Sequence, residues 1–182
     1  ACGRMGYQYE ALKLFLTEDR SEAVEICNKL NDYNKERQEE EKRIFAQAIE
    51  MLNNENEKDD PIIILGNENW HHGVIGIVSS KLTEQYFKPS ILICFEGEEG
   101  KGSGRSVPGF DLHAALTNCS QYLTKFGGHS MAIGISLSKS NFSKFKDEFE
   151  DYALKSNLKD IVPVLNIDNE ITTKEITIEA VK

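Results

Sequence analysis

The feature that most constrains the fold is an alternation of short apolar runs with helix-like segments that begins at Pro61. Ile62–Leu65, Ser90–Phe95 and Met131–Leu137 are predicted to be buried strands, because each is a brief apolar run bounded by turn-forming or polar residues. Strands separated by helices predict an α/β layer in which a mixed or parallel sheet is flanked by helices. The segments expected to be helices are 74–86, 111–126 and 141–154, and residues 96–104 are expected to form a hydrophilic loop.

The residues before Pro61 have a helical pattern. Residues 7–16 have the apolar spacing of a short amphipathic helix, and a second, much longer helix is expected to extend to about Leu52. Its middle, residues 34–43, is polar on all sides, which is typical of a helix that connects two bodies, although the solvated face of an ordinary helix has the same composition. The hydrophilic run 53–60 is the predicted domain boundary.

Charge argues against a general polyanion binder, since 21 basic and 30 acidic side chains give a net charge of −9. Residues 61–137, however, hold 5 basic and 6 acidic side chains, so this segment is close to neutral. No apolar run approaches the ~20 residues that span a bilayer. Four well-separated cysteines predict neither a disulfide framework nor a zinc site, and we expect a reducing, cytoplasmic setting. No metal site is expected within the chain.

Three glycine-rich segments are candidate binding sites, of which the first is Trp70–Gly76. Its glycines allow backbone to approach a ligand, the helix that follows favours an anion, and Trp70 has a ring on which a base can stack. His71 is a weaker candidate contact. A tight turn with a surface tryptophan explains these residues equally well.

The second segment, Gly100–Ser106, places glycine at alternate positions. It is able to form an anion nest in which Ser103, Gly104 and Ser106 surround a phosphate and Arg105 makes a bidentate contact, although a flexible surface loop has the same composition. The segment lacks the spacing of a P-loop, so nothing predicts ATP hydrolysis.

The third segment follows a predicted helix. Gly127 suits the position just after a helix, which explains Gly128 and His129 less well. His129 is able to donate to a phosphate or a base edge, although a single histidine is more often a packed residue. Loops at one edge of an α/β sheet converge on a shared crevice. We therefore expect Trp70, His71, Arg105 and His129 to meet in one pocket.

Together these motifs resemble the DHH-associated C-terminal domain of the DHH phosphoesterase superfamily, and within it the RecJ-like single-strand-specific DNA exonucleases. The resemblance covers the chain from its first residues to about residue 155. It implies a substrate-binding domain that follows a long connector helix. The segments that carry it are CGRMG (2–6), LNDYNKERQEEE (30–41), WHHGVIGIVSSKL (70–82), GKGSGRSVPGFDLHAAL (100–116) and FGGHSMAIG (126–134).

The resemblance implies a division of the chain and of the chemistry. Residues 1–60 are expected to be the tail of a catalytic domain with connector helices, 61–157 the DHH-associated nucleic-acid-binding domain, and 158–182 the lead-in to an oligonucleotide-binding barrel. The catalytic DHH domain would precede this chain and bind two divalent metals, Mn²⁺ or Mg²⁺. His71-His72 follows Trp70 and not Asp, so it is not that metal motif. Arg4 is expected to be detached from its setting.

The function implied is strand binding within a 5′→3′ single-stranded-DNA exonuclease of DNA repair and recombination, with this chain inactive alone. The expected partners are single-stranded DNA and the DHH domain of the same protein. Two alternatives remain open: a non-hydrolytic RNA-binding or tRNA-binding module, and part of a DHH phosphodiesterase that acts on nanoRNA or cyclic dinucleotides. The nucleic-acid contacts carried over from the resemblance are Arg105, Ser106, Gly127, Gly128 and His129, with Ser103, Gly104, Trp70 and His71 beside them.

Overall fold

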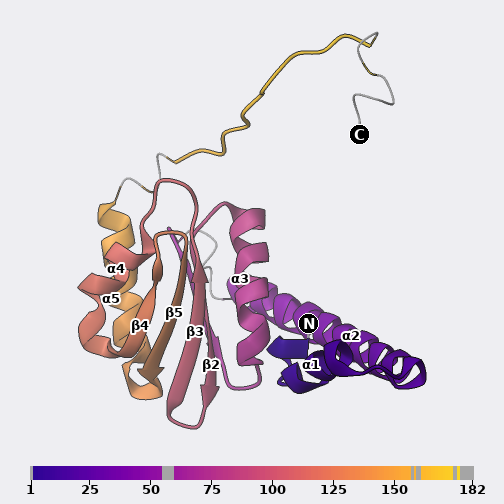
Figure 1. Ribbon diagram of the computed structural model, residues 1–182. Helices are drawn as coiled ribbons and strands as arrows, with labels where there is room; N and C mark the ends of the chain where they lie inside the picture. The colour runs from indigo at the N-terminus through magenta and orange to yellow at the C-terminus, as the bar shows by residue number, and fades with distance from the viewer. Residues whose placement is uncertain (1, 55–59, 157, 159–160, 174–175, 177–182) are drawn as a thin grey trace.

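The computed structural model describes residues 2–54, 60–156, 158, 161–173 and 176 (Figure 1). A helical arm comes first in the chain and an α/β body follows it. The elements of the arm are η1 (Cys2–Arg4), α1 (Gln8–Leu16) and α2 (Arg20–Asn54). Those of the body are β1 (Ile63–Asn67), α3 (His72–Tyr86), β2 (Ser90–Glu96), β3 (Glu99–Arg105), α4 (Leu112–Asn118), η3 (Ser120–Tyr122), β4 (Leu123–His129), β5 (Ala132–Ser138), η4 (Lys139–Asn141) and α5 (Phe142–Lys155).

The body is a five-stranded mixed sheet between two helical layers, as the sequence predicts. The strand order is β1-β2-β3-β5-β4, in which β1 and β2 are parallel and every other neighbouring pair is antiparallel. Helices α4 and α5 cover one face, and α3 lies on the other with α2 packed against it (Figure 1). Because α3 lies mainly over β2 and β3, it leaves part of its own face of the sheet to solvent.

Side chains of alternate strand residues supply two separate cores. On the α4 and α5 side, Ile93 and Ile135 from the sheet pack in one cluster with Phe145 and Phe149 from α5, all of them at most 4% exposed. On the α3 side, the apolar residues of β1 and β2 pack against α3 and the second half of α2. The main members of that cluster are Leu65, Leu92, Val74, Val78, Leu82, Ile44 and Leu52.

The prediction of a loop at residues 96–104 is wrong, because residues 99–105 form the central strand β3. Only a tight turn containing Gly97, with φ +61°, separates it from β2. A Cβ on Gly102 would lie 2.6 Å from the Ile135 side chain and 2.9 Å from that of Ile93. The alternate glycines of β3 are therefore spaces that large side chains of β2 and β5 fill, and they do not form an anion nest.

The predicted helix over 111–126 is also too long. The Asp111 carboxylate caps the start of α4 by accepting from the Ala114 N–H at 3.0 Å, but the helix ends at Asn118. After the short turn η3 the chain forms β4, which pairs with β5 at the edge of the sheet. Gly127 is consequently a strand residue, and its interpretation as the residue after a helix is wrong.

The predicted long helix is confirmed as one continuous α2, and its polar middle is anchored through Glu41. This carboxylate is only 7% exposed and forms ion pairs with Arg37 on α2 and Lys81 on α3. Burial alone would raise the pKa of Glu41, but the hydrogen bonds and positive charges of Lys81 and Arg37 lower it below its ordinary value. The polar run therefore contacts α3 instead of being solvated on every side.

The described part of the tail, residues 161–173, contains no helix or strand. The division of the chain into domains stays a prediction. Among the helices of the described residues, none has the length and apolarity needed to cross a membrane.

We predict that Gly102→Ala lowers the free energy of unfolding by about 1–3 kcal/mol, because its methyl group must displace packed isoleucine side chains. Gly134→Ala on the neighbouring strand is the matched control, since no atom lies within 4 Å of a Cβ there. Urea unfolding of the two variants measures the difference. Equal stability would contradict the packing explanation for the glycines of β3.

Candidate nucleic-acid interface

The candidate site is the part of the sheet on the α3 side that α3 leaves uncovered, here called the open face. Strand register arranges its residues in three rows across β3, β5 and β4. Because partners in a row lie on the same side of the sheet, each row presents its three residues together on the open face. We name them the arginine row (Arg105, Ala132, His129), the glycine row (Ser103, Gly134, Gly127) and the lysine row (Lys101, Ser136, Lys125).

Arg105 is the half-buried cation of the arginine row. Its Nη1 donates to the Ser103 Oγ at 3.2 Å and to the Gly104 carbonyl at 2.7 Å, and within the described residues it forms no ion pair with a carboxylate. Burial, followed by the nearby charge of Arg4, lowers the pKa of the Arg105 guanidinium from its ordinary value. A positive charge that is partly desolvated and repelled by a second one is stabilised by any anion that contacts both.

Arg4, which is expected to lack its setting at the edge of a catalytic domain, contacts helix α3 within this chain. Its Nη1 donates to the Gly73 carbonyl at 3.3 Å, so η1 lies against the first turn of α3. A Cβ on Gly73 would lie 2.0 Å from the Arg4 carbonyl oxygen, which means that only glycine permits this approach. The close contact places a second guanidinium beside Arg105.

The glycine row is a shelf of bare backbone. Gly127 and Gly134 are cross-strand partners, and no heavy atom lies within 4 Å of the position of a Cβ on either one. Gly128 has a different role, because its φ of +135° and a Cβ position 2.3 Å from the Ala132 carbonyl oxygen both require glycine. His129 follows on the exposed end of β4. Flat backbone beside cations suits a ligand that combines planar rings with phosphates.

Of the other predicted contacts, Ser106 and Trp70 are structural in this conformation. Ser106 is 6% exposed and its hydroxyl donates to the Phe110 carbonyl at 2.7 Å. Trp70 is 3% exposed, and its Nε1 donates to the Gln47 side chain of α2 at 3.0 Å. The indole therefore belongs to the core between the arm and the body and offers no exposed ring on which a base can stack.

His71 caps α3, with its Nδ1 accepting from the Gly73 N–H at 3.1 Å. The hollow that His71 and Trp70 line includes neither Arg105 nor His129. The expected meeting of Trp70, His71, Arg105 and His129 in one pocket is therefore wrong. What joins Arg105 to His129 is the sheet itself, through their shared partner Ala132.

Sequence reasoning did not single out the hollow of about 380 Å³ on the open face, whose lining includes His72, Ile75, Lys101, Lys125 and Ser136. The stacking of the His72 ring on His71, with centroids 5.1 Å apart, places His72 at the edge of α3. Only the cross-strand register brings Lys101 and Lys125 to the same hollow, and no motif in the sequence signals that register.

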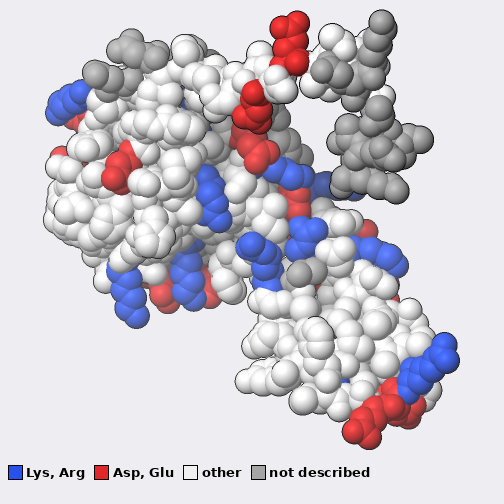
Figure 2. All heavy atoms as spheres, turned by 45° about the horizontal axis from the view of Figure 1, so that its top comes forward, with Lys and Arg blue, Asp and Glu red and all other residues white. Residues whose placement is uncertain are grey.

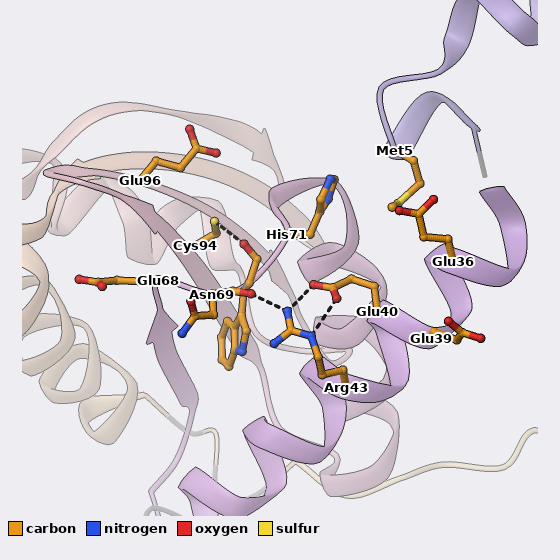
Figure 3. A pocket seen from close by; sticks show the side chains of 11 residues that line it. Met5, Glu36, Glu39, Glu40, Arg43, Glu68, Asn69, His71, Cys94 and Glu96 are labelled. Carbon is orange, nitrogen blue, oxygen red and sulfur yellow. Dashed lines mark hydrogen bonds and ion pairs between the residues drawn. The ribbon is translucent and has the colours of Figure 1, made fainter.

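A larger hollow of about 610 Å³ between α2 and the end of β1 has the opposite charge (Figure 3). Arg43 there donates to Glu40 at 2.6 and 2.8 Å and also contacts the Asn69 carbonyl. Cys94 donates to the Trp70 carbonyl at 2.7 Å. Four more carboxylates line this hollow. Glu68 is paired with Lys139 and Glu96 lies 4.0 Å from Lys101, whereas Glu36 and Glu39 form no ion pair within the described residues and disfavour a phosphate there.

On the face shown in Figure 2, basic side chains do not form one continuous surface. Lys and Arg are interspersed there with Asp and Glu, and several of the basic side chains lie at the junction between the body and the helical arm. Among the described residues, no group of three or more His, Cys, Asp and Glu side chains is placed to bind a metal ion. The described part of the chain therefore offers placed cations for a polyanion and no site that fits the two metals of the DHH chemistry.

Comparison with known proteins identifies the family, since the sequence matches the DHHA1 domain over residues 33–155. The chain belongs to the DHHA1 domain family. This DHHA1 chain is 33% identical to the single-stranded-DNA-specific exonuclease RecJ of Bacillus subtilis, over 100% of the chain and 23% of the relative. RecJ of Escherichia coli is 31% identical, over 82% of the chain and 27% of the relative. The DHHA1 chain thus spans about a quarter of the length of these curated relatives.

Solved structures agree with the fold of the DHHA1 chain. RecJ from Thermus thermophilus in complex with Mg²⁺ has a TM-score of 0.76 at 30% identity, covering 85% of this chain and 24% of the other. An exonuclease RecJ bound to manganese has a TM-score of 0.74 at 29% identity, and the match covers 87% of this chain and 41% of that structure. The resemblance to RecJ-like exonucleases and the predicted mixed α/β fold are both confirmed.

We predict that Gly73→Ala displaces η1 from α3, because its methyl group would overlap the Arg4 carbonyl. Trypsin should then cleave after Arg4 several-fold faster, as measured by mass spectrometry under native conditions. Gly3→Ala is the matched control within η1, since no atom lies within 4 Å of a Cβ there. An unchanged cleavage rate in Gly73→Ala would show that the close approach does not hold Arg4 in place.

Proposed function

We propose that this chain is the strand-binding part of a RecJ-like 5′→3′ single-stranded-DNA exonuclease, acting in DNA repair and recombination in the cytoplasm. The observation that carries the proposal is Arg105: a half-buried guanidinium without a carboxylate partner among the described residues, beside a second guanidinium and a shelf of bare glycine backbone. RecJ relatives that match 82% or more of the chain supply the substrate class.

In this proposal the residues of the open face bind and orient the strand. Arg105 makes a bidentate contact to a phosphate, with Ser103 holding the guanidinium in place and Arg4 adding charge from the other side. Gly127 and Gly134 let sugar and base approach the sheet closely, and His129 donates to a phosphate or base edge at the end of β4. The preference for single strands follows from the accessibility of the bases. In a single strand the base rings are free to lie on the glycine backbone, whereas a duplex keeps them paired and stacked inside.

The hydrolytic step belongs to another part of the longer protein. A DHH domain that precedes this chain would bind two Mn²⁺ or Mg²⁺ ions, which generate hydroxide and stabilise the transition state of phosphodiester hydrolysis. The role of the present chain is to hold the strand so that its terminal phosphodiester reaches those metals. Positioning of this kind contributes to the rate without any catalytic group in the DHHA1 domain itself.

A tRNA-binding module and a phosphodiesterase for nanoRNA or cyclic dinucleotides use the same chemistry of phosphate recognition. The three functions differ in the length and the sugar of the preferred ligand. Competition among single-stranded DNA, tRNA and a dinucleotide for the full-length protein distinguishes them. Preferential binding of tRNA or of the dinucleotide would replace the exonuclease proposal.

We predict that Arg105→Ala in the full-length enzyme weakens the affinity for single-stranded DNA and reduces the salt dependence of binding by about one phosphate contact. Arg105→Lys should restore only part of the affinity, because ammonium cannot form the bidentate contact. Arg20→Ala, at an exposed arginine that begins α2, is the control and should bind normally. An Arg105→Ala variant with unchanged affinity and salt dependence would overturn the proposed function.

We also predict that this chain alone, incubated with 5′-phosphorylated single-stranded DNA and Mn²⁺, releases no nucleotides. The reason is that its described residues gather no group that could bind the metals. Product analysis on denaturing gels measures this directly, with the full-length enzyme as the positive control. Mn²⁺-dependent release of nucleotides by the chain would contradict the assignment of hydrolysis to another domain.

A further inference from the structure

We propose that the lysine row of the open face, formed by Lys101, Ser136 and Lys125, is a second phosphate subsite for the same strand. The proposal rests on the proposed function and adds to it a direction and a length. It places one phosphate at Arg105 and a later one at the lysine row, with the glycine row between them. The ligand class is a single strand long enough to place phosphates at both positions, which neither a mononucleotide nor a dinucleotide can do.

The register of the sheet creates this row. Ser136 on β5 is the partner of Lys101 on β3 and also of Lys125 on β4, so one serine lies between two lysines in the row. With strands about 4.8 Å apart, the two lysine Cα atoms are about 10 Å apart. A phosphate above Ser136 is therefore within reach of both flexible lysine side chains and of the hydroxyl.

The alternation of β4 places Lys125 on this side of the sheet. Lys125 and His129 pair with Ser136 and Ala132 in one unbroken register, so both lie on the same side as Gly127. The register shifts before Lys125, where Leu123 pairs with Leu137. Leu123 therefore lies on the side of the apolar Leu137, whereas Lys125 stays on the open face with Ser136.

The charge of the lysine row is not neutralised within the described residues. Lys125 forms no hydrogen bond or ion pair there. Lys101 has one carboxylate neighbour, Glu96, at 4.0 Å, and the same exposed Glu96 lies 3.7 Å from the His72 Nδ1. An exposed pair at that distance contributes little stability, so both ammonium groups are available to a phosphate.

The hollow of about 380 Å³ beside the row gives the strand its path. Its lining combines the side chains of His72 and Ile75 on α3 with the two lysines and with Gly134, whose backbone carries no Cβ. Lys101 and Arg105 are four residues apart on β3, which separates their Cα atoms by about 13 Å. Successive nucleotides laid along β3 thus cross the glycine row between two cationic positions.

The acidic hollow near α2 limits the path on the other side of His71 and His72. Its lining includes Glu36 and Glu39, which form no ion pair within the described residues, and negative charges there repel a phosphate backbone. The nucleic-acid strand is therefore directed along β3 on the open face and away from the helical arm. This difference of charge between two neighbouring hollows explains why the overall charge of −9 does not exclude strand binding.

The test compares two thymidine ligands of the full-length enzyme, a 5′-phosphorylated dinucleotide and a decanucleotide. Lys101→Ala and Lys125→Ala should each weaken the binding of the decanucleotide severalfold and lower the salt dependence of that binding by about one phosphate contact. Neither substitution should change the affinity for the dinucleotide. Arg105→Ala should weaken both ligands. Lys155→Ala on α5, whose side chain is 79% exposed and paired with Asp151, is the matched control.

Each outcome separates the two proposals. Normal decanucleotide binding by both lysine variants, with weak binding by Arg105→Ala, overturns the second subsite and keeps the proposed function. If the lysine variants bind both ligands equally weakly, the second subsite is also overturned, because the lysines would then act on the ligand phosphate that Arg105 binds. Normal binding by all variants overturns the proposed function itself. Lys125→Arg keeps the charge and should bind the decanucleotide normally, which distinguishes lost charge from lost folding.

Discussion

The architecture depends on the missing side chains on one face of β3. Gly100, Gly102 and Gly104 leave spaces that Phe95, Ile135 and Ile133 fill from the neighbouring strands, so large apolar residues of β2 and β5 meet across the central strand. Any Cβ at these positions would lie between 2.6 and 2.8 Å from one of those side chains. Close packing on this face fixes the register of three strands, and the register in turn decides which residues reach the opposite face.

The opposite face takes its chemistry from the same alternation. Because every second residue of β3 is glycine, the residues between them, Lys101, Ser103 and Arg105, all point to the α3 side. Helix α3 covers β2 and β3 and leaves β5 and β4 open, which places the polar residues of β3 at the boundary between covered and exposed sheet. One sequence pattern thus serves the core on one side and a row of polar and cationic groups on the other.

The predictability of the fold from the sequence follows the distribution of apolar residues. Strands β1, β2 and β5 and the long helix α2 are predicted correctly, because buried apolar runs and helical spacing are local signals. Strands β3 and β4 are missed, because glycine has low strand propensity and the requirement for it at Gly102 and Gly128 comes from neighbouring strands. Tertiary packing decides these segments, and no window of sequence contains it.

The candidate site is predictable to a similar extent. Arg105 and the glycines of β4 stand in recognisable motifs, whereas Trp70 stands in one of those motifs and is a core residue bonded to Gln47. Lys125 is not predictable, since its place beside Lys101 depends on the pairing of β4 and of β3 with β5. A composition that disfavours polyanion binding overall therefore says little about one face of the sheet. A nucleic acid binds to a few placed cations and not to the average charge of the chain. In this protein carboxylates of α2 and of the ends of β1 and β2 line a hollow apart from the open face, so the acidity that dominates the composition does not set the charge of that face.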